Sequence, residues 1–458
     1  MARDTMTSLT FYGGAGEIGG TKILLEDKRD KVFLDFGEGF HLGAEQSHDH
    51  LDPANTFGLE GLFEFGLMPR IPRTFSPKAL KFTDMKYETP DIKGIFISHS
   101  HSDHIGHLPY VDPSIPVFMG HGTHLIADTY HEVYSSFFEI GEHDTINEFH
   151  SGDRIRFQEL VVEPVHVEHS VPGAYGFIVN TSRGPVVYTG DLRMHGPRSD
   201  MTREFLRKAA KARPRALLIE GTNMTADPEH NFTEEQVMAK VNSIVSKSRG
   251  TVFTFFPQTN VDRFMTFYQS AVKNRRILVV GFSLARFLQK FRSKITVLPD
   301  PLTDPHIKIY HRPHKSGDFT AEDYKWSWHK ELYGNRITFR EIQAKPRKYL
   351  VHVTFTYLTD LVHIQPKDAD FIYSSSEHFY EGEENEEQRE VWQTWMRHFG
   401  ITFHKAHCSG HASREDLVEM IRTINPEILI PVHTEVPEEF RKYHDHVVLP
   451  QKEGTLRL

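Results

Sequence analysis

Four histidines and one aspartate lie within the twelve-residue segment S-H-S-H-S-D-H-I-G-H-L-P at 98–109. The apolar run G-I-F-I precedes it and is expected to form a short buried strand. In an extended segment, residues i and i+2 point to the same side, so His99 and His101 can reach one ion. Asp103 and His104 follow where the chain is expected to turn into a helix, and can reach a second ion. Burying such groups together without a partner is costly, so the pattern predicts a metal site.

The remaining ligands are expected to be imidazoles and carboxylates, because the chain has 30 histidines and a single cysteine, Cys408. Several apolar segments elsewhere in the chain end in a polar residue of this kind. The candidates at these segment ends are Asp35, His166, His169, Asp191 and His433. His107 falls outside the spacing and is expected either to support the ligands from behind or to lie at the surface.

Length and composition limit the classes of protein to which the chain can belong. A chain of 458 residues is too long for one ordinary core, so two domains, or one domain with a large insert, are expected. The net charge of -9 argues against a protein that coats nucleic acid through bulk charge. No apolar run approaches the roughly 20 residues of a membrane helix. The start lacks the apolar core of a signal peptide, and one cysteine excludes an intramolecular disulfide, so we expect a cytoplasmic enzyme.

Two architectures follow each other along the chain. The region before about residue 221 reads as short strands with few helices, and residues 46–92 read as an irregular insertion or lid. Residues 233–294 alternate between helix and strand, which is typical of a parallel α/β domain. A helix is expected from Ser413, since S-R-E-D forms a capping box.

The segment G-A-G-E-I-G at 14–19 matches the G-x-G-x-x-G pattern of dinucleotide-binding folds. That function needs a helix that opens at the last glycine and holds a pyrophosphate at its N-terminus. The residues that follow, T-K-I-L-L-E, alternate and favour a strand instead. We therefore interpret the segment as a glycine-rich hairpin and expect no bound dinucleotide.

The polar segments together resemble those of the metallo-β-lactamase superfamily. H-S-H-S-D-H is similar to the signature of that superfamily, and T-G-D-L-R, which contains Asp191, is similar to its later aspartate motif. The segment H-S-V-P, which begins at His169, looks like the family's H-S-x-P segment, and this favours His169 over His166 as a ligand. The resemblance implies an α/β fold, the αββα sandwich of the metallo-β-lactamases.

The same resemblance implies a ligand set for two zinc ions, with manganese as the alternative metal. The implied ligands are His99, His101 and His169 for one ion, Asp103, His104 and His433 for the other, and Asp191 as the bridge between them. Asp35 would orient a ligand histidine. A pair of such ions activates water and stabilises charge on the attacking and leaving oxygens, so the implied chemistry is hydrolysis.

The large α/β segment resembles the β-CASP branch of this superfamily, whose members process nucleic acids. Glu220, His411 and His433 stand at the three motif positions of that branch. The resemblance implies that Asp103, Glu220, His407 and His411 are catalytic, with His411 as the general acid. The implied domains are a first part of the metallo-β-lactamase domain at 1–221, an inserted β-CASP domain at 222–399, and the C-terminal part of the first domain at 400–458.

Within the branch, the chain is most similar to ribonuclease J of the short archaeal type. The histidine at the third motif position, His433, is typical of members that act on RNA. The implied function is a 5′→3′ exoribonuclease with endonuclease activity, which leaves 5′-phosphate and 3′-hydroxyl ends on single-stranded RNA. A homodimer is also implied. One departure leaves the 5′-end preference open: where ribonuclease J has a glycine-serine segment, this chain reads V-T-F-T-Y-L-T-D, and hydroxyls for a terminal phosphate would come from Ser374, Ser375 and Ser376.

Three alternatives remain open at the level of sequence. A structure-specific DNA nuclease of the same branch would use the same ligands. A metallo-hydrolase of small esters would need neither the large insert nor Glu220 and His411. A non-catalytic RNA-binding subunit would be expected to lose metal ligands, and here all the implied ligands are present.

Overall fold

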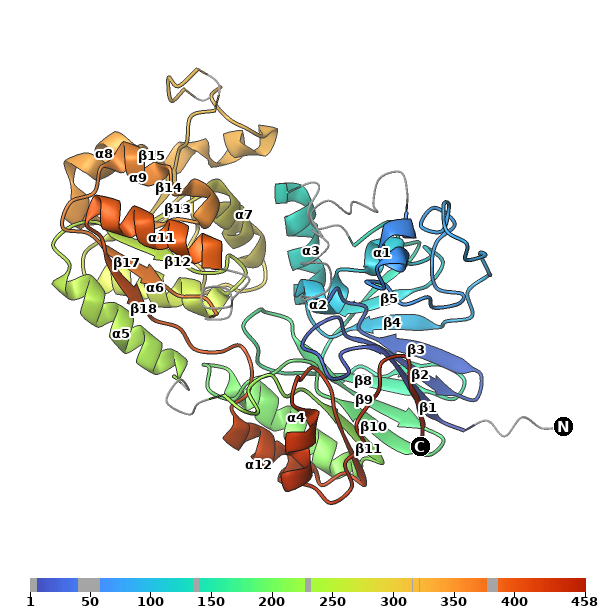
Figure 1. The fold of residues 1–458 in the computed structure, drawn as a ribbon. Helices are drawn as coiled ribbons and strands as arrows, with labels where there is room; N and C mark the ends of the chain where they lie inside the picture. Colours follow the sequence, from blue (N-terminus) through green and yellow to red (C-terminus); the bar gives the residue numbers. More distant parts are fainter. Residues whose placement is uncertain are drawn as a thin grey trace. The chain divides into compact units, whose positions relative to one another are not determined.

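The computed structural model describes residues 6–39, 58–134, 140–226, 232–314, 316–320, 322–376 and 386–458. The chain forms two compact units (Figure 1). The first comprises Met1–Pro228 and Gly410–Leu458, and the second comprises Glu229–Ser409. Compactness alone does not assign a family to each unit, so the domain bounds given above stay predictions.

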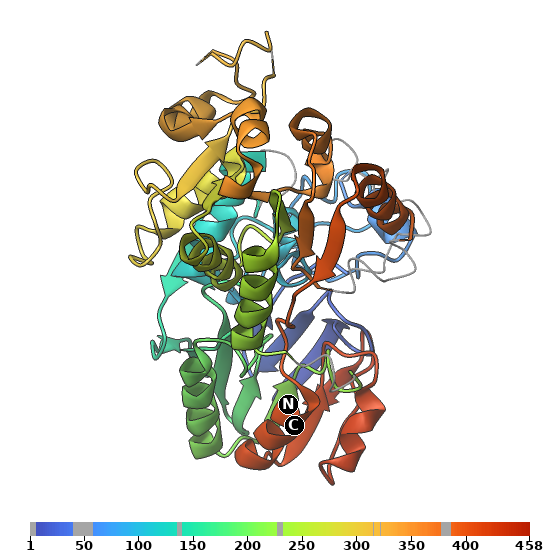
Figure 2. The same ribbon diagram turned by 90° about the vertical axis from the view of Figure 1, so that its left-hand side faces the viewer.

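Two β-sheets form the frame of the first unit. One sheet has the strand order β20-β1-β2-β3-β4-β5-β6, with bounds β1 Ser8–Gly13, β2 Lys22–Asp27, β3 Asp30–Leu34, β4 Gly94–Ile97, β5 Val117–Gly120, β6 Ile146–Phe149 and β20 Thr455–Arg457. The other has the order β19-β11-β10-β9-β8-β7, with bounds β7 Ile155–Arg156, β8 Val161–His166, β9 Tyr175–Thr181, β10 Gly184–Tyr188, β11 Ala216–Ile219 and β19 Ile428–Pro431. Because β20 pairs with β1, the two ends of the chain belong to the same unit (Figure 2).

The main core of this unit lies between its two sheets. Phe11 and Phe96 from the first sheet pack in one apolar cluster with Phe177, Val186 and Ile430 from the second. Helices cover the outer faces, and their bounds are α1 Glu60–Glu64, α2 Ser102–Ile105, α3 His121–Tyr134, α4 Ser199–Ala212 and α12 Arg414–Ile424. In Figure 1, α4 and α12 lie on the outer side of the sheet that contains β8 to β11. The predicted αββα sandwich is therefore confirmed.

Residues 58–92 form part of the core of the first unit. Apart from the short helix α1 they are irregular, as expected. Leu62, Ile71 and Phe75 are buried, however, against Phe33 and Ile95 on the outer face of the first sheet. The interpretation of this described part as a lid is wrong, because its apolar side chains cover the sheet. Residues 46–57 of the expected insertion lie outside the described residues.

Two local predictions are confirmed by the backbone. Residues 14–19 join β1 to β2, which pair antiparallel, and no helix follows them. The glycine-rich segment is thus a hairpin connection and not the start of a nucleotide-binding helix. Helix α12 begins after Ser413, whose side chain accepts a hydrogen bond from the Asp416 amide at 3.1 Å.

The second unit is an α/β domain around one parallel sheet. The strand order is β15-β14-β13-β16-β12-β17-β18, with bounds β12 Val252–Phe255, β13 Ile277–Val280, β14 Ile307–Tyr310, β15 Arg336–Ile337, β16 Tyr349–His352, β17 Asp370–Tyr373 and β18 Thr402–Lys405. Its helices are α5 Glu234–Lys247, α6 Val261–Lys273, α7 Phe282–Phe291, α8 Phe339–Ala344, α9 Asp360–Ile364 and α11 Glu386–Phe399. Ile342, Leu361 and Trp392 bring α8, α9 and α11 into one apolar cluster with the sheet. Across the described parts of both units, every helix is too short or too polar to cross a lipid bilayer.

Candidate metal centre and active site

The histidine-rich segment is held at the end of β4 by close backbone contacts. His101 is extended (φ -69°, ψ 146°), and Asp103 and His104 lie on α2, as the spacing predicted. The amide of Phe36 donates to the His104 carbonyl at 2.9 Å. Gly37 passes so close that a Cβ atom there would lie 1.7 Å from the Asp103 carbonyl oxygen. Only glycine allows this approach, which fixes the path of the ligand-bearing turn.

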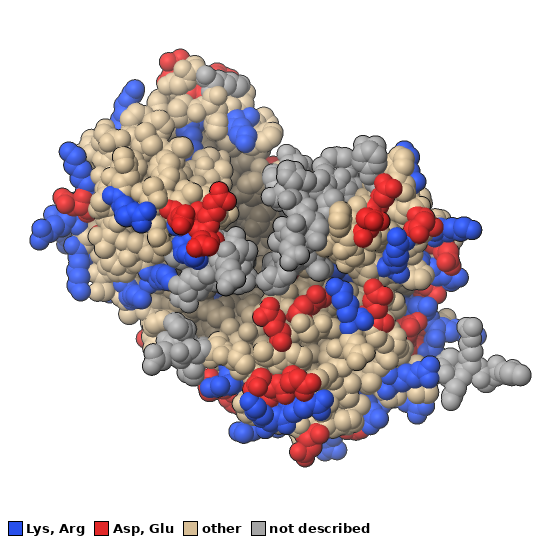
Figure 3. All heavy atoms as spheres, viewed as in Figure 1, with Lys and Arg blue, Asp and Glu red and all other residues tan. Residues whose placement is uncertain are grey.

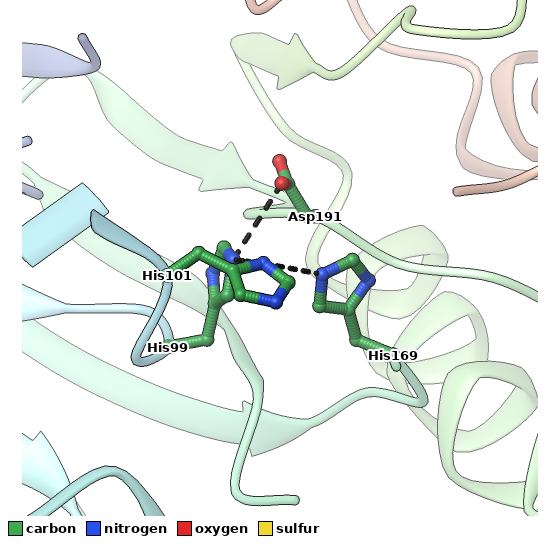
Figure 4. A group of neighbouring side chains, drawn as sticks. All are labelled: His99, His101, His169 and Asp191. Carbon is green, nitrogen blue, oxygen red and sulfur yellow. Dashed lines mark hydrogen bonds and ion pairs between the residues drawn. The ribbon is translucent and has the colours of Figure 1, made fainter. Parts of the chain in front are cut away.

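Three imidazoles and one carboxylate form the first group of candidate ligands (Figure 4). His101 Nδ1 lies 3.0 Å from His99 Nε2 and 3.1 Å from His169 Nε2. His99 Nε2 lies 3.6 Å from Asp191 Oδ2. Ligands of a tetrahedral zinc ion are separated by roughly 3.3 Å, given zinc–nitrogen distances of about 2.0–2.1 Å. The spacing of these four groups therefore fits one shared cation.

Asp191 also belongs to a second group, with Asp103, His104 and His433. Asp191 Oδ2 lies 3.2 Å from His104 Nε2 and 3.7 Å from His433 Nε2. Asp103 Oδ2 lies 2.9 Å from His433 Nε2. All four side chains are buried. The two groups share only Asp191, so the structure brings together all seven side chains that the sequence suggested as ligands.

Four of the histidines are oriented by a partner on the ring edge that faces away from the cluster. In each, Nδ1 contacts an outer group, and Nε2 is left for the shared space. The pairs are His99 with Ser98 Oγ at 3.0 Å, His104 with Asp35 Oδ2 at 2.7 Å, His169 with the Gly410 carbonyl at 2.6 Å, and His433 with Thr222 Oγ1 at 3.0 Å. Partners of this kind set the ring tautomer and orientation of metal-binding histidines.

Asp35 connects two parts of this arrangement. Besides His104, its carboxylate accepts hydrogen bonds from the Ser98 amide at 2.6 Å, the Ser98 hydroxyl at 2.8 Å and the Tyr188 hydroxyl at 2.6 Å. Asp35 itself has a left-handed backbone (φ 60°), as does His433 (φ 51°). Such conformations cost about 1–3 kcal/mol and persist where the surroundings enforce them, often at functional sites.

Electrostatics in the cluster favour a bound cation. Burial lowers the pKa of His99, His101 and His169, that of His101 to about 4, so these rings are neutral and can donate lone pairs. Burial acts in the same direction on His104, but neighbouring carboxylates, Asp191 first, outweigh it and raise the pKa well above its usual value. For Asp191, burial favours the neutral form, yet the imidazoles around it hold its pKa well below the usual range. The site thus concentrates negative charge and lone pairs.

Two buried atoms at the centre of the cluster support the same conclusion. Among the described residues, His104 Nε2 and Asp191 Oδ1 have no hydrogen-bond partner. A buried polar atom without a partner costs about 1–3 kcal/mol. A cation would satisfy both atoms, so the residues present fit a metal centre.

His411 lies at the edge of the cluster and is held by Glu220. His411 Nδ1 is 3.2 Å from Glu220 Oε1 and 3.8 Å from Asp191 Oδ2. Burial lowers the pKa of His411, but Glu220 and then Asp191 outweigh this effect and raise it to about 9. His411 could also join Glu220 and His433 as a third group of possible metal ligands. Its position therefore allows either proton donation or metal binding.

Other residues suggested by the sequence lie elsewhere. His407 belongs to the second unit, where its Nδ1 is 3.1 Å from Arg263 Nη1. His166 stacks on Tyr175, with ring centroids 4.2 Å apart, and is not among the candidate ligand groups of the described residues. His107 is buried, so the alternative that placed it at the surface is wrong.

The serines suggested for a terminal phosphate differ in their surroundings. The Ser374 hydroxyl is fully buried; it accepts a hydrogen bond from Arg263 at 2.5 Å and donates to the Ala406 carbonyl. Ser375 is buried as well, and Ser376 is partly exposed. Their role with a phosphate stays a prediction.

Several outer partners of the ligands could not be identified from the sequence. Tyr188 and Thr222 contact Asp35 and His433 across the fold, and nothing in their local sequence marks them. Ser98 was within reach of prediction, since it directly precedes His99 at the end of a buried strand. The Gly410 carbonyl is a backbone group, and its contact to His169 depends on tertiary structure alone.

We expect Asp35→Asn to weaken metal binding about 10–100-fold, because the variant removes the charge that orients His104 and leaves all seven candidate ligands in place. Asp30→Asn is the matched control: Asp30 is equally buried in the same unit, but accepts hydrogen bonds from the Glu159 and Leu160 amides. Competition with a chromogenic chelator measures both affinities. Equal affinities in the two variants would contradict the orienting role.

Two family models match the chain. The "Beta-lactamase superfamily domain" matches residues 72–243, and the "Zn-dependent metallo-hydrolase RNA specificity domain" matches residues 402–447. The first match contains six of the seven candidate ligands together with Glu220, and the second contains His411 and the seventh ligand, His433.

Curated relatives align along most of the chain. Ribonuclease J of Helicobacter pylori (strain B128) is 24% identical over 93% of this chain and 56% of its own length. Ribonuclease J of Pyrococcus abyssi (strain GE5 / Orsay) is 24% identical over 98% of this chain and 94% of its own. The chain thus spans little more than half the length of the bacterial relative and nearly all of the archaeal one.

A solved structure shares the whole fold. The crystal structure of a protein of unknown function from Enterococcus faecalis V583 superposes with a TM-score of 0.78 and 25% identity, covering 99% of this chain and 100% of that one. The fold, the two family models and the relatives agree with the ligand cluster built above. The chain thus contains a segment that matches the β-lactamase superfamily domain and a segment that matches the metallo-hydrolase RNA specificity domain, and along most of its length it is similar to ribonucleases J.

Proposed function

We propose that this protein is a metal-dependent ribonuclease that hydrolyses RNA phosphodiesters and leaves 5′-phosphate and 3′-hydroxyl ends. The observation that carries the proposal is the placement of the His411–Glu220 pair beside Asp191, at the edge of a cluster that fits cations. A group that can donate a proton therefore lies next to groups that can hold an activated water.

The proposed cofactor is a pair of zinc ions, with manganese as the alternative. The shared position of Asp191 between two ligand groups supports two ions rather than one. Imidazole and carboxylate ligands suit zinc. When bound, such ions supply an activated water and neutralise charge on the phosphoryl group. The ligand residues bind and orient them, and the outer partners fix the ring tautomers.

His411 is proposed as the general acid for the departing 3′-oxygen. The Glu220 carboxylate can only accept hydrogen bonds, so the Nδ1 atom of His411 holds a proton against it. With its pKa raised, the ring is protonated near neutral pH and can give up the proton on Nε2. Asp103 is proposed to act as a metal ligand, and His407 as a donor to the phosphoryl oxygens of the substrate.

RNA is proposed as the substrate in preference to DNA. The model that matches residues 402–447 is named for RNA specificity, and His433, which that match contains, is the residue typical of RNA-acting members. The names of the curated relatives point the same way. On the visible face, cationic and acidic side chains are interspersed on the described surface of each unit (Figure 3). Recognition would then depend on local groups more than on net charge.

The mode of cleavage follows the resemblance. We propose 5′→3′ exonuclease action on single-stranded RNA, with endonuclease activity in addition. Since the Ser374 hydroxyl already contacts Arg263, Ser375 and Ser376 are the better candidates for a terminal phosphate. This proposal is tested with RNAs that differ only in having a 5′-phosphate, a 5′-triphosphate or a 5′-hydroxyl, by measuring the lengths of the products over time.

A homodimer and a cytoplasmic location are also proposed. Light scattering tests the first, and cell fractionation tests the second.

We expect the protein to cleave end-labelled RNA and to leave DNA of the same sequence intact. A chelator should abolish the cleavage, and added zinc or manganese should restore it, because activation of the attacking water depends on the metal ions that the seven candidate ligands would hold. Products are resolved on a sequencing gel. Cleavage of DNA alone would favour the DNA nuclease. Hydrolysis of small esters with both nucleic acids intact would favour the small-ester hydrolase.

A further inference from the structure

Two segments of the first unit that carry candidate ligands are joined through their backbones. His169 directly follows Glu168 in one segment, and Asp191 lies two residues before Arg193 in the other. The amide of Arg193 donates a hydrogen bond to the Glu168 carbonyl at 2.8 Å. Both Glu168 and Arg193 are buried. The two segments are therefore held together within one or two residues of each ligand.

The hydroxyl of Thr202, on α4, closes a ring of three hydrogen bonds with these segments. It accepts from the Glu168 amide at 2.9 Å and donates to the Arg193 carbonyl at 2.9 Å. The bond between the Arg193 amide and the Glu168 carbonyl is the third side of the ring. Thr202 is fully buried, and a hydroxyl has only one proton to donate. That proton is committed to the segment that carries Asp191.

The direction of this hydroxyl bond is unusual for a threonine in a helix. Such a hydroxyl ordinarily bonds to a carbonyl three or four residues earlier in its own helix. Thr129 in α3 does so, since it donates to the Leu125 carbonyl at 2.6 Å. Thr202 instead donates to Arg193, which lies outside α4. Its bonds therefore connect the helix to the two ligand-bearing segments.

The apolar packing of α4 does not require a hydroxyl at this position. Phe205 and Leu206 of α4 belong to the same buried apolar cluster as Val167 and Leu192, which lie on the two ligand-bearing segments. A valine in place of Thr202 would have nearly the same shape and would add no polar atom to this cluster. What the hydroxyl contributes is its pair of hydrogen bonds. Its effect is thus to align the two segments.

We infer that Thr202 is a positioning residue that sets the separation of His169 and Asp191 in the metal centre. These two side chains belong to one ligand group, whose ligand atoms all lie within 4.8 Å of one another. The second ligand group contains Asp191 but not His169. The ion of the first group should therefore depend on Thr202 more than the ion of the second. This inference rests on the metal centre of the proposed function, and not on RNA as the substrate.

The first test measures metal binding and needs no RNA. Metal-free protein is titrated with cobalt(II), whose visible absorption depends on the geometry of its ligands. We expect Thr202→Val to weaken the binding of one cobalt ion about tenfold and to change its absorption bands, because His169 and Asp191 are no longer held in register. Thr202→Ser should restore both the affinity and the bands, since it keeps the hydroxyl.

Thr129→Val is the matched control for Thr202→Val. Thr129 is equally buried in the same unit, but its hydroxyl bond stays within its own helix. Both variants should lower the melting temperature of the metal-free protein, and only Thr202→Val should change cobalt binding. Should Thr202→Val fail to fold, Thr202→Ser and Thr202→Ala give the same comparison, because both lack the methyl group and only serine keeps the hydroxyl.

The second test measures how RNA cleavage depends on added zinc. If Thr202 acts through the ligands, Thr202→Val should raise the zinc concentration needed for half-maximal cleavage about tenfold. The KM for RNA at saturating zinc should stay at the wild-type value. Thr129→Val should leave both quantities unchanged.

The outcomes separate the inference from the proposed function. Wild-type cobalt affinity and absorption in Thr202→Val would overturn the inference. So would equal changes in Thr202→Val and Thr129→Val, or a serine variant that binds cobalt no better than the alanine variant. A protein that shows the expected cobalt results but cleaves no RNA would refute the proposed ribonuclease and leave the role of Thr202 in place. A wild-type protein that binds no cobalt would refute the metal centre, and the inference with it.

Discussion

Asp191→Ala is expected to abolish RNA cleavage and to release bound metal. Asp191 is the one side chain shared by both ligand groups, with its Oδ2 atom 3.2 Å from His104 Nε2 and 3.6 Å from His99 Nε2. Removing it leaves several neighbouring imidazoles without the charge that favours a cation. Because metal activation of water is worth several kcal/mol, the loss of turnover should exceed about a thousandfold.

Metal analysis by mass spectrometry and single-turnover cleavage of labelled RNA measure the two effects of Asp191→Ala. Asp27→Asn serves as the control, since Asp27 is equally buried in the first unit and is held by Thr7 and Ser182, not by any candidate ligand. The control should keep its metal and cleave RNA near the wild-type rate. If Asp191→Ala retained a full complement of metal, the bridging assignment would be wrong.

His411→Ala is expected to lower turnover by about a hundredfold to ten-thousandfold while leaving the metal content unchanged. The size is that of general acid catalysis, and the unchanged metal follows because His411 lies outside the two groups that share Asp191. The position of His411 beside Glu220 and His433 makes the metal measurement decisive. Loss of metal together with activity would show that His411 is a ligand and would refute the general acid role.

His166→Ala provides the control for His411→Ala. His166 is a partly buried histidine of the same unit that stacks on Tyr175, and it belongs to none of the candidate ligand groups of the described residues. It was also the alternative to His169 in the same segment. Its variant should keep both metal and activity, and a loss of metal there would revise the choice of ligand.

Local sequence was sufficient for much of the fold. The run G-I-F-I predicted β4 because four apolar residues bounded by polar ones suit a buried strand. Ser413 predicted the start of α12 because its hydroxyl can accept from an amide three residues later. Both predictions depend only on residues that are neighbours in the chain, and the tertiary structure contains the strand and the helix start that they predict.

The role of the segment 58–92 could not be predicted from neighbouring residues in the chain. Its residues have no helical or strand periodicity, so the sequence did not indicate what they do. Leu62 and Phe75 are buried because the outer face of the first sheet, with Phe33 and Ile95, is apolar and needs a cover. The apolar face exists only once the sheet has formed, so the sequence pattern of this segment predicts a lid and gives no sign of the face that it covers.

The candidate site divides in the same way. The spacing of the residues was enough to predict that His99 and His101 point toward one ion and Asp103 and His104 toward another, because spacing within a strand or helix determines the direction of each side chain. The set that includes His169, Asp191 and His433 came from the resemblance to a known family, and the structure brings the ligand atoms of each group to within 4.8 Å of one another.

The sequence by itself determined which residue types are available for a metal and how the histidine-rich segment directs them. Only the tertiary structure decided which partner faces each ring: Asp35 for His104, the Gly410 carbonyl for His169, and Arg263 for His407. The physical reason is that a tautomer is set by the group opposite each ring nitrogen. These groups come from distant segments or from the backbone, so no local pattern can specify them.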